Sequence, residues 1–143
     1  LAKMRRLQGV RKVLLLEEAW KAIAKEGMAS YVRYLFKTVR KYFGEAIVVT
    51  QEVEDIISSP IVKESIINNA DCKILLDQRK YRNKFDQIQT LLGLTDKERA
   101  QVLSINLSND PARRYKEVFI SLGGVQSAVY ATEVSDEEYL VRP

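Results

Sequence analysis

KVLLLEE, residues 12–18, and EAIVVTQ, residues 45–51, are the two stretches that decide the fold. Each is a short, continuous run of apolar residues that ends in polar ones. Such runs are typical of strands that are buried on both faces of a parallel sheet. A third run of this kind, DCKILLD, covers residues 71–77. We expect strands at 12–17, 45–50 and 71–77, side by side in one sheet.

Helical patterns separate these runs. Residues 28–43 carry apolar side chains at helical spacing on one face and basic side chains, among them Arg40, on the opposite face. Gly44 ends this pattern. The predicted apolar face consists of Met28, Tyr31, Val32, Leu35, Phe36, Val39 and Phe43. Ser59 and Pro60 are typical of a helix start, and the helix they begin should end near Asn68.

The last third of the sequence predicts further helices and a hairpin. A helix closed by Gly93 precedes a second helix, whose start is marked by the capping box Thr95 to Glu98. Strands 115–122 and 125–132 flank Gly123-Gly124, which predicts a β-hairpin, and Ser135 opens a final helix. Strands that alternate with helices indicate an α/β fold. We therefore predict one domain over residues 1–143, with a mostly parallel sheet flanked by helices and a C-terminal antiparallel hairpin.

The composition excludes several classes of site. The 143 residues include no histidine, which removes His-based catalytic triads and most zinc sites, so that acid–base chemistry must use carboxylates. The single cysteine, Cys72, excludes an internal disulfide and fits a reducing compartment. No run approaches the roughly 18 apolar residues of a membrane span. The net charge of +4 permits contact with nucleic acid or acidic lipid and argues for neither.

Polar residues at the ends of the first two strands carry the candidate chemistry. In a parallel sheet, ligands bind beyond the carboxyl ends of the strands, where Glu17, Glu18, Thr50 and Gln51 fall. In nucleotide hydrolases an apolar strand followed by two acids is the Walker B element, in which the first acid helps to hold Mg²⁺ and the second polarises the attacking water. A glutamine side chain donates to a phosphate and accepts from water at once. The alternative is a pair of solvated strand ends.

Cations follow the third strand in Asp77-Gln78-Arg79-Lys80-x-Arg82. Such a cluster stabilises developing phosphate charge, in the same subunit or from a neighbour, unless it is ordinary solvated charge. The phosphate loop GxxxxGK[ST] occurs nowhere in the sequence. Because that loop precedes the Walker B strand in such proteins, and because the sequence begins with Leu1, we expect a piece of a longer protein.

The residues resemble a known family at this point. EEAW at 17–20 and VVTQEVEDI at 48–56 resemble the TraG-type ATPases of conjugative transposons, and the likeness continues through FISLGG at 119–124 to YATEVS at 130–135. These ATPases energise type IV secretion and belong to the FtsK–HerA superfamily. The resemblance implies a RecA-like core, ATP hydrolysis with Mg²⁺, and a ring or hexamer. It also implies a cytoplasmic place at the base of the secretion channel, peripheral to the inner membrane, beside other conjugation components.

The resemblance also assigns roles by position. It makes Glu17 the magnesium-side acid, Glu18 the catalytic base and Gln51 the sensor glutamine. From its place at the strand end, Thr50 is expected to lie beside the nucleotide. Many motors of the wider class carry aspartate in place of Glu17, and the longer glutamate side chain is expected to reach the magnesium ion through water. For the arginine finger, Arg40 and Arg79 both remain candidates.

Two other interpretations stay open. A DNA-translocating motor of the same superfamily would use the same catalytic residues and would differ by a basic pore that binds DNA. A non-catalytic oligomerisation or interaction module is the second alternative, because a piece without the phosphate loop should neither bind nor hydrolyse ATP well. The sequence upstream of Leu1 would separate these classes.

Overall fold

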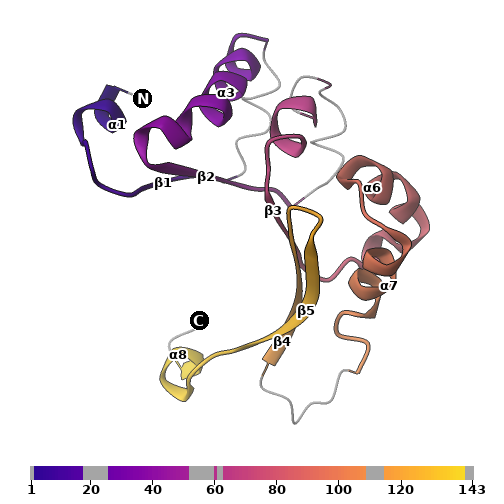
Figure 1. Ribbon diagram of the computed structural model, residues 1–143. Coiled ribbons are helices and arrows are strands. Elements are labelled where there is room, and N and C mark those ends of the chain that lie inside the picture. The colour runs from indigo at the N-terminus through magenta and orange to yellow at the C-terminus, as the bar shows by residue number, and fades with distance from the viewer. Residues whose placement is uncertain (1, 18–25, 52–59, 61–62, 109–114, 141–143) are drawn as a thin grey trace. The chain divides into compact units, whose positions relative to one another are not determined.

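The structure, a computed structural model, describes residues 2–17, 26–51, 60, 63–108 and 115–140. It forms two compact units, Leu1–Ala70 and Asp71–Pro143, which are described here one at a time (Figure 1). Over the described residues, no helix is both long enough and apolar enough to cross a membrane. The prediction that residues 1–143 are one portion of a single P-loop domain stays a prediction.

The first unit is built on a parallel pair of strands. Strand β1 (Lys12–Glu17) pairs with β2 (Gly44–Val49) from Lys12 opposite Gly44 to Glu17 opposite Val49. This confirms the parallel pairing expected of the two apolar runs. Exposure alternates along both strands, because successive side chains point to opposite faces, and Val13 and Leu15 are exposed. This corrects the expectation that the runs are buried on both faces. A short helix, α1 (Ala2–Arg6), precedes β1, and a π-helical turn, η2 (Lys63–Ile67), follows in the same unit.

Helix α3 (Glu26–Thr38) connects the strands and continues as a 3₁₀ turn, η1 (Val39–Tyr42). Val32, Leu35 and Val39 are buried, as the helical pattern predicts. Met28, Tyr31 and Phe43 are exposed, which corrects the predicted apolar face at both ends. Near the C-terminal end, the tighter 3₁₀ turn advances each side chain by about 120° instead of 100°, so the α-helical pattern no longer holds. Phe43 then adopts a left-handed backbone conformation, with φ of 52°.

Pro60 has a helical conformation, in agreement with the helix start predicted there. Ser59, the predicted N-cap of that helix, lies outside the described residues. A turn at Asn68 and Asn69 follows η2, where the end of that helix was expected.

The second unit contains a three-stranded antiparallel sheet. Strand β3 (Cys72–Leu75) pairs with β4 (Tyr115–Leu122), which pairs with β5 (Gln126–Glu133). The β4–β5 hairpin confirms the prediction from Gly123-Gly124, and both glycines have positive φ, as a tight hairpin turn demands. The position of β3 corrects the expected fold. It belongs to this second sheet, antiparallel to β4, and not to a sheet shared with β1 and β2.

Helices α6 and α7, together with β4, supply the core of the second unit. A 3₁₀ turn, η3 (Arg79–Lys84), leads into α6 (Phe85–Leu92), which ends at Gly93 with φ of 64°. Helix α7 (Asp96–Ser104) lies along the β4–β5 hairpin (Figure 1). Phe85 and Phe119 are completely buried in this core. Among the described residues of the unit, the other buried apolar side chains are Ile88, Leu91, Leu94, Val102 and Ile105.

The predicted capping box at the start of α7 is formed. The Thr95 backbone N–H donates to Glu98 Oε2 at 2.8 Å, and the Glu98 N–H donates to Thr95 Oγ1 at 3.2 Å. Buried Glu98 also accepts from Ser121 Oγ at 3.1 Å. Burial alone would raise the pKa of Glu98, but the hydrogen bonds from Thr95 and Ser121 hold it below its usual range. Ser135 and Glu138 cap α8 (Asp136–Leu140) in the same way.

Candidate nucleotide site

The carboxyl ends of β1 and β2 bring three predicted site residues together. The register places Glu17 opposite Val49, and Thr50 and Gln51 follow Val49 directly. Thr50 is half-buried, while Glu17 and Gln51 are exposed. Glu18, the predicted base, lies outside the described residues. The parallel pairing therefore gathers Glu17, Thr50 and Gln51 at one edge of the sheet, where ligands of α/β proteins bind.

Arg40 lies at the other end of the same strands. It belongs to η1, four residues before Gly44, where β2 begins to pair in parallel with β1. A six-residue strand rises by roughly 17 Å, so Arg40 and Glu17 lie at opposite edges of the sheet. Within one subunit the structure does not bring these two side chains together.

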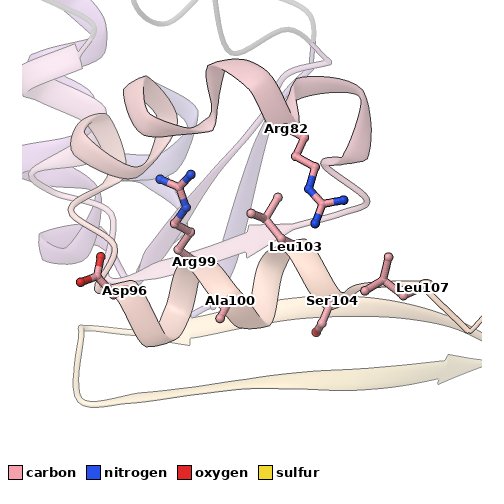
Figure 2. Close-up of a pocket in the computed structure, with 7 residues that line it drawn as sticks. All are labelled: Arg82, Asp96, Arg99, Ala100, Leu103, Ser104 and Leu107. Carbon is pink, nitrogen blue, oxygen red and sulfur yellow. The ribbon is translucent and has the colours of Figure 1, made fainter.

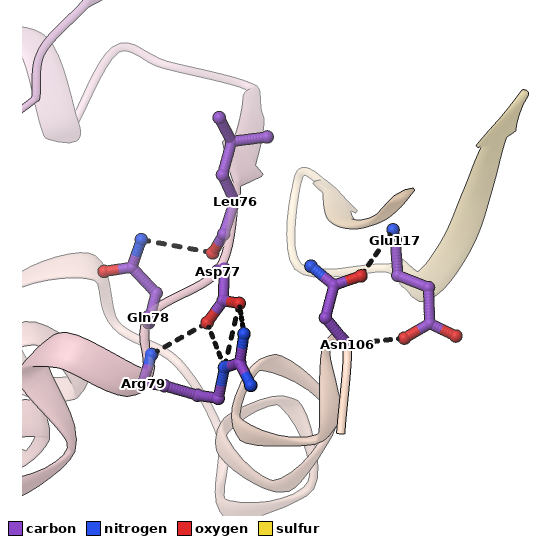
Figure 3. A network of polar contacts seen from close by, with 6 residues as sticks. All are labelled: Leu76, Asp77, Gln78, Arg79, Asn106 and Glu117. Atoms are coloured by element: carbon purple, nitrogen blue, oxygen red, sulfur yellow. Dashed lines mark hydrogen bonds and ion pairs between the residues drawn. The ribbon is translucent and has the colours of Figure 1, made fainter. Parts of the chain in front are cut away.

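Arg79 lies in the second unit and is held by its neighbour Asp77 (Figure 3). Arg79 Nε donates to both carboxylate oxygens of Asp77, at 3.0 and 2.9 Å, and Nη2 donates to Oδ2 at 2.6 Å. The Arg79 backbone N–H donates to Oδ1 at 3.0 Å. These hydrogen bonds, led by that of the Arg79 side chain, hold the pKa of Asp77 below its usual range. The guanidinium group of Arg79 is thus already hydrogen-bonded to a carboxylate of its own chain.

Asn106 and Glu117 form a second polar pair beside the Asp77–Arg79 pair. Asn106, with φ of 56°, donates its backbone N–H to Glu117 Oε2 at 2.7 Å and accepts from the Glu117 N–H through Oδ1 at 3.0 Å (Figure 3). Asparagine tolerates this left-handed conformation better than most residues. The two bonds tie the end of α7 to β4.

Arg82, from the same basic cluster, behaves differently. It lines a shallow pocket of about 340 Å³ together with Asp96, Arg99 and Leu103 (Figure 2). Arg99 is paired there with Asp86 and also donates to Gln89 Oε1 at 2.9 Å. Arg82 was predicted only as part of a charge cluster, and Arg99 was not among the predicted site residues. The helical spacing of Asp96, Arg99, Leu103 and Leu107, three or four residues apart, was the available signal for this face.

The comparisons with known proteins settle the family. Residues 1–142 match the model of the TraG P-loop domain. The chain belongs to this family. Among curated proteins, it is 33% identical over 92 residues to the type IV secretion system protein CagE of Helicobacter pylori (strain ATCC 700392 / 26695). That match covers 64% of this chain but 9% of CagE, so the chain spans a small part of that relative.

The fold of this TraG P-loop domain chain is also found in a solved structure. It superposes on VirB4 of Thermoanaerobacter pseudethanolicus with a TM-score of 0.68 and 24% identity, over 96% of this chain and 35% of VirB4. This likeness shows the fold alone.

The donors at the strand edge of the TraG P-loop domain chain fit a hydrated magnesium ion. Among the described residues, no cluster of three or more His, Cys, Asp or Glu side chains is placed to hold a metal. Mg²⁺ at phosphate sites does not need one, since it keeps several waters and takes one or two protein carboxylates. Glu17, exposed at the end of β1, meets that requirement as an oxygen donor.

Proposed function

We propose that this chain supplies the acid and sensor side chains of the ATP site in a RecA-like type IV secretion motor. The observation that carries the proposal is the parallel register, which puts Glu17 beside the end of β2, where Thr50 and Gln51 follow. Membership of the TraG P-loop domain family supports the same assignment. In the longer protein, hydrolysis would drive DNA–protein transfer or assembly of the channel.

Each side chain has a distinct role in this proposal. Bound Mg²⁺ would neutralise phosphate charge, and Glu17 would hold it, mainly through water. Glu18 would accept a hydrogen bond from the attacking water and draw off its proton. Gln51 would orient the γ-phosphate and that water, and Thr50 would border the nucleotide. An arginine from a neighbouring subunit would stabilise the transition state.

The position of Arg40 favours action across a subunit boundary, because it lies at the sheet edge opposite Glu17 in its own chain. Arg79 would first have to leave Asp77. Both roles imply a ring of subunits, and the likeness to CagE and VirB4 suggests a place among secretion components on the cytoplasmic side of the inner membrane. Direct contact with DNA through a basic pore would distinguish the alternative, a DNA-translocating motor of the same superfamily.

The test is to replace each acid in the longer protein that joins this chain to a phosphate loop. We expect Glu18→Gln to bind ATP normally and to hydrolyse it about 10²-fold more slowly, the usual scale for a lost general base. Glu17→Gln should also weaken nucleotide affinity and shift the Mg²⁺ dependence. The measurements are ATP binding and steady-state hydrolysis over a Mg²⁺ titration.

Glu45→Gln is the matched control, because Glu45 lies on the same sheet near the opposite edge and forms an exposed ion pair with Arg11. It should leave hydrolysis unchanged. If Glu18→Gln hydrolyses ATP at the parental rate, the pair of acids is a solvated strand end and the catalytic proposal fails. If the parent neither binds nor hydrolyses ATP, the interaction-module alternative holds.

A further inference from the structure

A basic pocket lies at the sheet edge opposite the candidate nucleotide site. It has a volume of about 320 Å³, and its lining includes Arg5, Lys12 and Lys41, with Leu7 and Phe43 beside them. Lys12 and Gly44 form the first pair of the parallel register, so the pocket lies where the strands begin. Roughly 17 Å of strand separate it from Glu17. None of the residues proposed to bind nucleotide lines it.

The cations of this pocket are positioned by uncharged partners. Lys12 Nζ donates to the Tyr42 carbonyl oxygen at 2.7 Å. Arg5 donates to Tyr34 Oη at 3.0 Å and lies 5.6 Å from the centre of the Tyr42 ring. No carboxylate occurs among the described residues that line the pocket. The positive charges of Arg5 and Lys12 are therefore oriented without being neutralised, which suits an anion with several oxygen acceptors, such as a phosphate group.

Leu7 and Phe43 line the pocket with these cations, and Val10 lies two residues before Lys12 in the sequence. Leu7 is 47% exposed, Val10 53% and Phe43 66%. Phe43 also holds a left-handed backbone conformation, with φ of 52°, which costs free energy for a residue with a side chain. The turn thus keeps an aromatic ring in solvent at the mouth of a basic pocket.

We propose that this pocket binds the phosphate of an anionic phospholipid head group at a membrane surface. Arg5, Lys12 and Lys41 would contact the head group, while Leu7, Val10 and Phe43 would enter the boundary between head groups and acyl chains. Cations combined with exposed apolar side chains are the usual composition of a peripheral membrane site. Single-stranded nucleic acid fits this surface less well. Its bases would stack on the Phe43 ring, but such binding would not explain why the aliphatic side chains of Leu7 and Val10 are exposed.

The test measures binding of the 143-residue chain to vesicles of phosphatidylglycerol in phosphatidylcholine, and of phosphatidylcholine alone. We expect binding to the anionic vesicles only, and weaker binding as salt is raised. Lys41→Glu should reduce the affinity about tenfold or more, because it reverses one charge at the membrane. Phe43→Asn should reduce it by a similar factor, and asparagine accepts the left-handed conformation, so the fold should survive.

Lys97→Glu is the matched control, since it makes the same charge change at an exposed position on α7 in the other unit. It should bind like the parent, and circular dichroism should show every variant folded. The proposal is overturned by binding to neutral vesicles, by an equal loss in Lys97→Glu, or by no binding to either vesicle. It is also overturned if a single-stranded oligonucleotide binds through Lys41 and Phe43 in place of lipid. None of these outcomes depends on ATP hydrolysis, so this test and that of the proposed function fail separately.

Discussion

Asp77 owes its low pKa to Arg79, and this gives the stability of the second unit a defined dependence on pH. A carboxylate whose pKa is lower in the folded state stabilises the fold above its unfolded pKa, near 4, and loses that contribution as the pH falls through the folded value. We expect Asp77→Asn to be less stable than the parent at pH 7. The difference should shrink as the pH falls through the folded pKa of Asp77, because the parental carboxyl then becomes neutral, as the asparagine amide already is.

Urea unfolding of both proteins across that pH range measures the effect. Glu137→Gln serves as the control, because Glu137 is exposed on α8. The difference in stability between the parent and this control should not change with pH. A gap between parent and Asp77→Asn that stays constant from pH 7 to pH 2 would contradict the role given to the Asp77 carboxylate.

At the scale of single elements, the capping box at Thr95 should set the stability of α7. Thr95→Ala removes the oxygen that accepts the Glu98 N–H. Loss of such a cap costs about 1 kcal/mol of the free energy of unfolding. Thr95→Ser retains the hydroxyl and should recover most of that loss. Denaturation of the three proteins by urea measures both effects, and equal stabilities for the alanine and serine variants would contradict the assignment.

Elements that local chemistry dictates were predictable from the sequence. The Thr95 and Ser135 caps, the Gly93 stop and the Gly123-Gly124 hairpin each depend on residues within a few positions of one another, and all are present. The end of the 28–43 helix was predicted less well. Periodicity assumes a constant angle per residue, and the 3₁₀ turn at Val39–Tyr42 breaks that assumption just before Phe43.

The candidate site residues were also predicted in part: those at the strand ends were located from the sequence, and the pairing of Arg79 was not. The ends of two apolar runs located Glu17, Thr50 and Gln51, and the parallel register places them at one edge. The bidentate hold of Asp77 on Arg79 was not foreseen, because it forms across two residues of irregular chain, where no helical or strand period applies. Their sequence cluster showed charge, but not which charges are already paired.

At the scale of the whole molecule, strand partners were the hardest feature to predict. The 71–77 run has the same apolar character as the 12–17 run, yet β3 pairs antiparallel with β4. Composition specifies that a strand forms, whereas its partner depends on contacts between residues far apart in sequence. Alternating exposure along Cys72–Leu75 agrees with a strand that has one open face.

The 143-residue chain should show no appreciable ATP hydrolysis by itself. It contains no GxxxxGK[ST]. In P-loop proteins, the backbone N–H groups of that loop form most of the hydrogen bonds that bind the phosphates. Adding a segment that carries the loop should restore turnover. Phosphate release from the purified chain measures this. Steady turnover by the chain alone, abolished by Glu18→Gln, would contradict the expectation.

The antiparallel sheet of the second unit has a consequence for the order of folding. Residues of the β4–β5 hairpin pair across a tight turn, whereas Cys72 of β3 pairs with Leu122, 50 positions away. Hairpins close within about 1–10 μs, and contacts between distant residues form more slowly because a long loop must first be closed. During refolding, β4 and β5 should therefore pair first. Strand β3 should join only after α6 and α7 have condensed, and its arrival should set the folding rate of this unit.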